Sequence, residues 1–426
     1  MLRALVIITA MFGSVLSFHS LYAFHILAIL WLYITTLKIA SGGTVTIQKP
    51  QLLLAFALLT IYFLLSGLWA VDMKVWARYI AYWSCGLIAL AAVYQSATER
   101  TSLWRTLQLV GVLWGLNMAI GLIETTGLFR LPISPYSAYA HLFGYKGIDL
   151  SALNETAKLA LSHMPTGFNW NQNDFAFVLL LGLPFILLCP NRKYAFIGFS
   201  LALYLLIIIG SKGIFLALIF MLMLLPAYLN YPLKRAALLV LALLFFSGSL
   251  AVFVSIAGIE TYGIKRIFSI VDQIIRGISM IAWDPSFTND STGTRAHIYY
   301  YGLHRFFSSG ALGLGLGGAE SSLIHEGFKI QSFHFFFLQM LIDLGAIAFV
   351  FFIAAYLWLV LRLRTVGLKS GDQRMRCLAR ASSLALIVAI PASITPSGVH
   401  YELSYYIVVG LGLAILKVHS MEDTST

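Results

Sequence analysis

Long apolar runs recur from one end of this chain to the other, and they constrain the fold more than any other feature. A helix needs about 20 mostly apolar residues to cross the hydrocarbon core of a bilayer. Hydrophobic residues form 60% of the 426 residues, well above their usual share in a soluble domain. The pattern predicts an all-α polytopic membrane protein, folded as a single integral membrane domain over residues 1–426. We count about twelve spans, at 4–18, 20–37, 51–70, 77–97, 104–125, 171–189, 194–210, 213–229, 236–257, 333–360, 379–395 and 402–417.

Lysine and arginine are distributed unevenly between the connections of these spans. If the N-terminus is cytoplasmic, most of the cations fall in cytoplasmic connections, and the opposite short connections hold little more than Lys74, Arg78 and Lys212. Because cytoplasmic loops carry an excess of lysine and arginine, two long loops, 126–170 and 258–332, are predicted to face the periplasm. The net charge of +11 is therefore interpreted as a sign of topology and not of nucleic-acid binding.

The second long loop contains two predicted helices. In the stretch IKRIFSIVDQIIRGISMI, apolar residues recur at helical spacing and share one face. This helix either lies in the membrane interface or packs on the bundle as a lid, and the sequence leaves both alternatives open. The next helix is predicted from Thr294 or Arg295 to Ser308. Gly313, Gly315 and Gly318 then match a dinucleotide-binding pattern formally, but no strand precedes them, so we predict a turn that returns the backbone to the bundle.

His334 stands where this polar loop meets the run SFHFFFLQMLIDLGAIAFV. An imidazole can accept and return a proton near neutral pH, and few side chains here share that ability, since only 11% of residues are charged. The same loop carries six cations: Lys265, Arg266, Arg276, Arg295, Arg305 and Lys329. A base beside several cations indicates proton transfer next to a bound anion. The alternative is that His334 only anchors its helix at the interface; His325, His297 and His163 are then the next candidates for a base.

Three asparagines precede the span at 171–189, in the stretch GFNWNQNDFAF. Asn169, Asn171 and Asn173 are either N-caps of that helix or, together with its positive end, ligands for phosphate or sugar oxygens. Lys212 lies in GSKG, a predicted tight outer turn, where a lone lysine often extends to the surface.

The predicted outer face has no DxD motif and no closely spaced His and Glu pair, so metal-dependent catalysis is not expected and no cofactor is predicted. One favoured histidine with a surplus of cations suits a reaction whose leaving group is a lipid diphosphate, because cations stabilise its charge. Outside the cytoplasm no ATP drives a transfer. The donor must therefore arrive activated, and a lipid-linked sugar diphosphate is the natural form.

Three sequence blocks resemble the O-antigen ligase and polymerase superfamily of bacterial inner-membrane proteins. SFHFFFLQMLIDLGAIAF is similar to the block in which a histidine opens a helix and is followed by Leu-Gln and a glycine. STGTRAHIYYYG with GLGLGG is similar to the block that carries an arginine and a Gly-x-Gly, which points to Arg295. GFNWNQNDFAFVLLLGLP is similar to the Asn-x-Asn block before a span. Span number and loop placement extend the resemblance over nearly the whole chain.

Within the superfamily the chain looks most like the O-antigen ligase, which transfers the glycan from undecaprenyl diphosphate to the lipid A–core oligosaccharide. The resemblance implies an inverting, metal-independent transferase of the inner membrane whose site faces the periplasm. His334 would be the general base, and Arg295 and Lys212 would bind the diphosphate, with Arg266 or Arg78 in support. Asn169 and Asn173 would contact the glycan or cap the helix.

Three positions depart from the family pattern. Lys212 stands where the ligase usually has arginine, so a single-point cation would replace a forked guanidinium. Thr294 replaces the glycine before the family's arginine, and the aromatic residue a few positions later is Tyr299 or Tyr300. O-antigen polymerases and protein O-oligosaccharyltransferases share the same motifs. A lipid or glycan transporter is the alternative from another class; ionisable residues would then be expected near the midplane, where Asp343 is the main example here.

Overall fold

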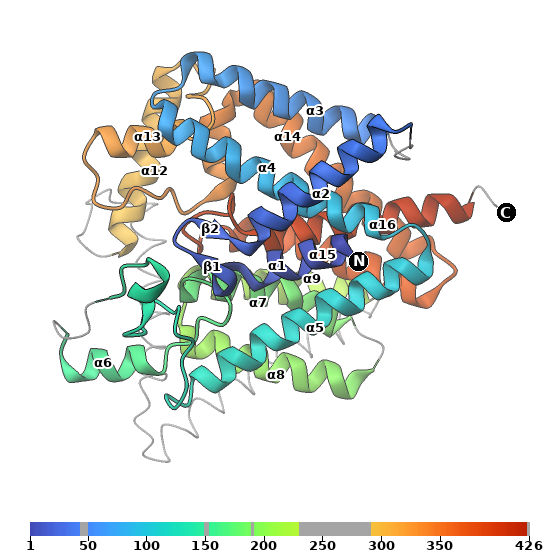
Figure 1. Ribbon diagram of the computed structural model, residues 1–426, viewed down its shortest axis with the longest axis horizontal. Coiled ribbons are helices and arrows are strands. Elements are labelled where there is room, and N and C mark those ends of the chain that lie inside the picture. The colour runs from blue at the N-terminus through green and yellow to red at the C-terminus, as the bar shows by residue number, and fades with distance from the viewer. Residues whose placement is uncertain (43–49, 149–152, 189–190, 230–290, 424–426) are drawn as a thin grey trace.

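The computed structural model describes the chain except for residues 43–49, 149–152, 189–190, 230–290 and 424–426 (Figure 1). The predicted span at 236–257, the predicted amphipathic helix after it and Arg266 lie outside the described residues. Within the described part the protein is mostly helical, and the helices lie side by side as a bundle (Figure 1).

The first half of the chain begins with a helix that is shorter than predicted. The expected span 4–18 ends at Phe12, because Gly13 adopts a φ of 51° that interrupts the helix. A short 3-10 turn and a two-stranded hairpin follow, in which Ser17 pairs with Tyr22. The elements are α1 (Leu2–Phe12), η1 (Gly13–Leu16), β1 (Ser17–Phe18), β2 (Leu21–Tyr22), α2 (Ala23–Ala40), α3 (Pro50–Leu65), η2 (Ser66–Trp69), α4 (Met73–Ser96), α5 (Arg100–Glu124), η3 (Ala140–Phe143) and α6 (Glu155–Ser162).

The second half agrees more closely with the predicted boundaries. Each predicted span within the described residues coincides with a helix, and the helix predicted to end at Ser308 does end there. The elements are α7 (Gln172–Leu187), α8 (Arg192–Ile209), α9 (Lys212–Leu229), α12 (Ser291–Ser308), α13 (Gly318–His325), α14 (Phe336–Lys369), α15 (Gln373–Ala392) and α16 (Leu403–Asp423).

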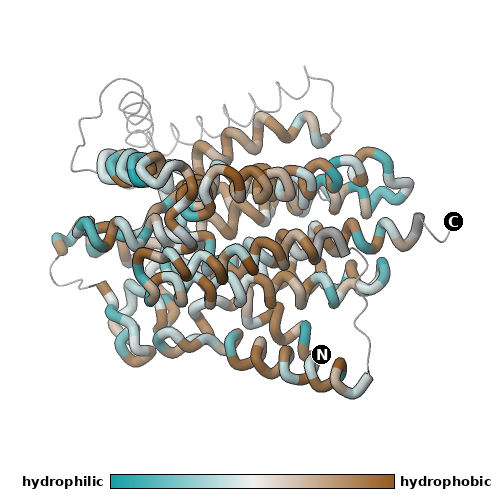
Figure 2. The backbone as a smooth tube through the Cα atoms, turned by 90° about the horizontal axis from the view of Figure 1, so that it is seen from above, coloured by the Kyte–Doolittle hydropathy of each residue, from teal (hydrophilic) through white to brown (hydrophobic). Residues whose placement is uncertain are grey.

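Seven of the described helices are long and apolar enough to cross a membrane, and four shorter apolar helices accompany them. Their outward faces are apolar: Ile29, Phe196 and Phe351 are 68%, 65% and 72% exposed. Hydrophobic residues run along the helices while hydrophilic ones gather toward their ends (Figure 2). A soluble monomer rarely exposes so much apolar surface. These features fit a multi-pass membrane protein; the count of twelve spans and the side each loop faces remain predictions.

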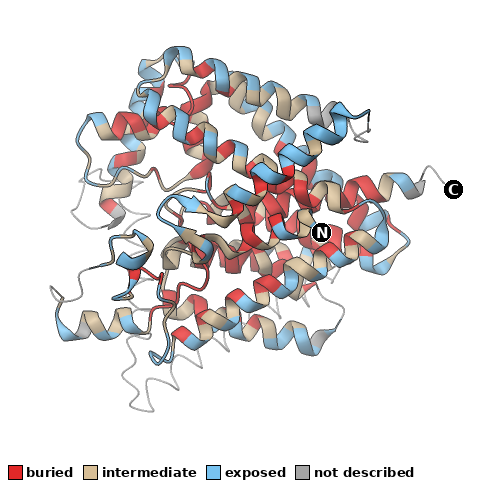
Figure 3. Cartoon of the chain, viewed as in Figure 1, coloured by how far each residue is buried: buried red, intermediate tan, exposed pale blue. Residues whose placement is uncertain are grey.

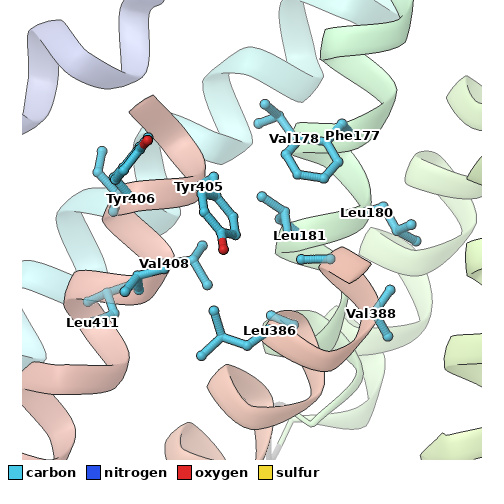
Figure 4. Packing of buried hydrophobic residues seen from close by; sticks show 14 of the residues in the cluster. Phe177, Val178, Leu180, Leu181, Leu386, Val388, Tyr405, Tyr406, Val408 and Leu411 are labelled. Carbon is cyan, nitrogen blue, oxygen red and sulfur yellow. The ribbon is translucent and has the colours of Figure 1, made fainter. Parts of the chain in front are cut away.

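The buried core lies where α7, α15 and α16 meet, and the helices around them are more exposed (Figure 3). Phe177 and Leu181 of α7, Leu386 of α15 and Tyr405 of α16 point into this region (Figure 4). We call the end of the bundle that carries α6, α12 and α13 the loop end. The other end, which carries the start of α5, the turn from α14 to α15 and the end of α16, we call the basic end (Figure 1).

A break in α14 holds the glycine-rich loop between α12 and α13, residues 309–317, against the bundle. Gly345 has a φ of 80° and interrupts the helix, and Tyr62 donates a hydrogen bond to the carbonyl of Leu344 just before the break, at 2.5 Å. The backbone N–H of Leu314 donates to the carbonyl of Ile342 at 2.9 Å. A Cβ on Gly313 would lie 2.4 Å from the Gly345 nitrogen, so no side chain fits there. The predicted turn back to the bundle is confirmed.

Candidate functional site

His334 and the starts of α9 and α7 lie around one buried connection, the 395–402 segment between α15 and α16. Thr395, Pro396, Val399, His400 and Glu402 are buried in it. Sequence reasoning treated this segment as a short loop between two spans and singled out none of its residues. A polar stretch that contains a histidine and a glutamate between two apolar runs was the available signal.

His334 sits in a strained backbone conformation directly before α14. Its φ is 56°, in the left-handed region that side chains other than glycine rarely adopt. Its Nδ1 lies 3.2 Å from the carbonyl oxygen of Pro396, and its Nε2 lies 2.8 Å from the hydroxyl of Ser332. Because a carbonyl only accepts, Nδ1 carries the proton and donates to Pro396. The lone pair of Nε2 therefore accepts from Ser332, and it is the atom that can take a proton from a substrate.

Burial lowers the pKa of His334 to about 4, and the positive charge of Arg295 lowers it further, while the backbone bonds of Pro396 and Thr395 oppose the shift. The imidazole is therefore neutral at pH 7 with Nε2 free to accept a proton. An anion bound at Arg295 would offset the charge that depresses this pKa. Binding of an anion there should thus raise the basicity of His334.

Arg295 projects from the first half of α12, which packs beside α14 (Figure 1). Tyr299, one turn later, donates its hydroxyl to the backbone carbonyl of His334 at 3.2 Å, so α12 is fixed to the His334 backbone. Burial lowers the pKa of Arg295, and within the part of the chain that the structure describes no carboxylate forms an ion pair with it. A half-buried guanidinium without a carboxylate favours an anionic ligand.

Lys212 opens α9, directly after the turn at Gly210 and Ser211. Its neighbour Gly213 lies against the segment: a Cβ there would come within 2.5 Å of the Thr395 hydroxyl. The start of α9 therefore reaches the same segment that holds His334.

The start of α7 reaches the segment from another side. Asn171 is the N-cap of α7, and its side chain accepts from the backbone of Asn173 and Asp174; the helix-cap alternative is thus wrong for Asn169 and Asn173. Asp174 lies beside the buried Glu402 and the backbone of Ser397, and its Oδ2 accepts from Asn171 Nδ2 at 2.5 Å. Burial raises the pKa of Glu402 well above its ordinary value, and the neighbouring Asp174 raises it further. The two neighbouring buried carboxyls therefore favour a state in which they share one proton.

Arg78 belongs to a separate network on α4. Its guanidinium lies 2.5 Å from Glu320 of α13, which also accepts from the hydroxyl of Tyr79. The Tyr79 ring packs against His400 with 4.7 Å between centroids. Arg78 thus approaches the segment only through Tyr79, and its charge is already paired with a carboxylate. Its predicted role in diphosphate binding has less support than those of Arg295 and Lys212.

Several buried polar atoms beside the site lack a hydrogen-bond partner among the described residues: Asn169 Nδ2, Thr395 Oγ1 and His400 Nε2. Such groups are costly unless a ligand or water satisfies them. They are therefore candidates to contact substrate oxygens, and Asn169 keeps its predicted role as a glycan ligand.

The other candidate bases are less well placed. His163 donates to the carbonyl of Thr125 at 2.8 Å, since that oxygen only accepts, and so holds the first long loop. His297 is exposed and packs on Phe328, with 4.8 Å between ring centroids. His325 is exposed at the end of α13. Of these histidines, His334 is the one that contacts the 395–402 segment.

Asp343, the residue that suggested a transporter, has a structural role. It is fully buried in α14 and accepts from the backbone of Gly317 at 2.9 Å and of Ala319 at 2.8 Å, which caps α13. The break at Gly345 is a feature that transporters share. The Asp343 carboxylate nevertheless accepts hydrogen bonds from two backbone N–H groups, so it offers no open site for a coupling ion.

Comparison with curated proteins gives one distant relative. The chain is 24% identical over 398 residues to the teichuronic acid biosynthesis protein TuaE of Bacillus subtilis, a match that covers 87% of this chain and 72% of that protein. No protein-family profile matches the chain. The similarity connects the chain to a protein whose name places it in teichuronic acid biosynthesis.

Proposed function

We propose that this protein is a glycosyltransferase that moves a glycan from undecaprenyl diphosphate to an acceptor hydroxyl at the loop end of the bundle. The observation that carries the proposal is the pairing of His334 and Arg295. A neutral imidazole, whose unprotonated Nε2 accepts from Ser332, lies beside a half-buried guanidinium that no described carboxylate neutralises. This arrangement suits a base next to an anionic leaving group.

The proposed reaction is a single displacement. The acceptor hydroxyl displaces Ser332 from Nε2, which places the acceptor oxygen for attack on the anomeric carbon. The new glycosidic C–O bond forms while the bond from that carbon to the diphosphate oxygen breaks. The acceptor proton passes to Nε2 of His334, and undecaprenyl diphosphate leaves with its charge stabilised by Arg295 and Lys212. A single displacement inverts the anomeric configuration.

We propose the lipid A–core oligosaccharide as acceptor, which makes the protein an O-antigen ligase, on the strength of the sequence blocks around His334, Arg295 and Asn169. The runner-up is a polymerase of the same superfamily. The relative's name favours it, because that name refers to a teichuronic acid and not to lipopolysaccharide. Both the ligase and the polymerase function imply a protein of the bacterial inner membrane whose loop end faces the periplasm.

A deletion strain distinguishes the two functions. Loss of the lipopolysaccharide ladder with accumulation of undecaprenyl-linked polymer indicates the ligase. Accumulation of undecaprenyl-linked single repeats indicates the polymerase. If neither intermediate accumulates and the surface glycans are unchanged, the proposed function is wrong.

A further inference from the structure

An apolar cavity of about 280 Å³ lies inside the bundle, away from the site described above. It is enclosed by α1, α5, α7, α15 and α16, and Trp104, Trp114, Leu181 and Val408 line it. Leu181 and Val408 are directed toward the space between α7 and α16 (Figure 4). Neither His334 nor Arg295 lines it. The cavity is therefore separate from the proposed diphosphate site.

The cation on the cavity wall lies at the basic end. Arg374, the second residue of α15, is exposed and lines the cavity, and its guanidinium stands 5.3 Å from the Trp104 ring centroid. Nearby, Arg100 pairs with Asp372 at 3.3 Å, so the two arginines and one aspartate leave a net positive charge. The positive-inside rule predicts this end to be cytoplasmic, where anionic lipids attract basic residues.

Gly111 forms an open part of the cavity wall. It is exposed on α5, and a Cβ built on it would have no atom within 4 Å. The cavity is thus accessible at this point from the surroundings of α5, which for a membrane-spanning helix are lipid chains. A pocket with apolar walls and one well-placed charged group is typical of a binding site for an amphipathic molecule.

We propose that this cavity binds one acyl chain of an anionic glycerophospholipid from the cytoplasmic leaflet, with the lipid phosphate at Arg374. The apolar walls accept the chain, the opening at Gly111 admits it from the bilayer, and Arg374 selects the anionic head group. The acyl chain fills the space between α5 and the core helices. The polyprenyl chain of the donor is excluded as the occupant because its diphosphate would sit at the loop end, opposite Arg374.

The test uses the full-length protein in phosphatidylcholine nanodiscs with increasing fractions of phosphatidylglycerol brominated in its acyl chains. Bromine quenches nearby tryptophans, and Trp104 and Trp114 line the cavity. We expect saturable quenching in the wild type and loss of that component in Gly111→Leu, whose side chain occupies the cavity. Gly115→Leu is the matched control: Gly115 is on the same helix, has open space around its Cβ position and does not line the cavity.

Arg374→Gln tests the head-group contact separately and keeps the cavity, so it stays informative if Gly111→Leu does not fold. One cation near the head groups contributes about 1 kcal/mol, so the lipid fraction for half-maximal quenching should rise about fivefold. Equal saturable quenching by brominated phosphatidylcholine would overturn the proposal. So would displacement of the brominated lipid by undecaprenyl diphosphate, which would assign the cavity to the donor chain. Neither outcome bears on the role of His334.

Discussion

Substitution of His334 separates catalysis from backbone strain, because the residue has a φ of 56°. Alanine in the left-handed region costs about 1–2 kcal/mol, whereas asparagine tolerates that region. Both substitutions remove the base. We therefore expect His334→Ala and His334→Asn to lower turnover alike, by about 10² to 10⁴-fold, while only the alanine variant loses clear thermal stability. Donor binding should persist in both, since Arg295 and Lys212 remain.

The assay uses purified protein in nanodiscs with an undecaprenyl-diphosphate-linked glycan and a lipid A–core acceptor, and size-exclusion and thermal unfolding profiles serve as folding controls. If His334 only anchored α14, the asparagine variant would keep most of its activity, because its amide can still donate to Pro396. A well-folded His334→Asn protein that transfers glycan near the wild-type rate would refute the role as base. His325, His297 and His163 would then be tested in turn.

The remaining predictions concern the pH profile and its dependence on Arg295, the buried carboxyls, the topology and the need for a metal. Because the pKa of free His334 is about 4, kcat/KM should stay level down to about pH 4 and fall below it as Nε2 is protonated. Arg295→Gln should move this acid limb to higher pH by removing the charge that lowers the pKa, besides weakening donor binding; an unmoved limb would mean that another group titrates. Glu402→Gln should retain stability because its amide can still donate to Asp174, whereas Glu402→Ala should lose about 1–3 kcal/mol of unfolding free energy. Equal melting temperatures of the two variants would contradict the shared proton. In single-cysteine variants, an impermeant maleimide should label position 295 and not 374 in intact cells, and the reverse would overturn the topology. Excess EDTA should leave transfer undiminished, and activity that vanishes with chelator and returns with magnesium would assign the chemistry to a metal site.

The helices were largely predictable from the sequence because apolar runs in a membrane protein are dictated by bilayer thickness. The predicted span 4–18 differs from the structure for a local reason. The α-helix ends at Phe12 because Gly13 takes a positive φ, and hydropathy carries no information about backbone angles. The break at Gly345 was missed for a related reason. The apolar pattern continues through it, and the loop that pairs with it is about 30 residues away in sequence.

The site was predictable in part. His334 and Arg295 were singled out by residue type, position and family resemblance, and the structure places them close enough for the charge of Arg295 to lower the His334 pKa. The contribution of the 395–402 segment was not predictable, since its role comes from tertiary contacts of Pro396, Ser397 and His400 with three distant helices. Asn171 was distinguished from Asn169 and Asn173 as the cap only by backbone geometry.

The most direct test of the central claim is the anomeric configuration of the product formed by the purified protein from an undecaprenyl-diphosphate-linked glycan. NMR of the new linkage should show inversion relative to the donor, because a single displacement assisted by His334 proceeds through no covalent intermediate. Retention of configuration, or a glycosyl group trapped on Ser332 or another side chain, would contradict the account and replace the base with a nucleophile.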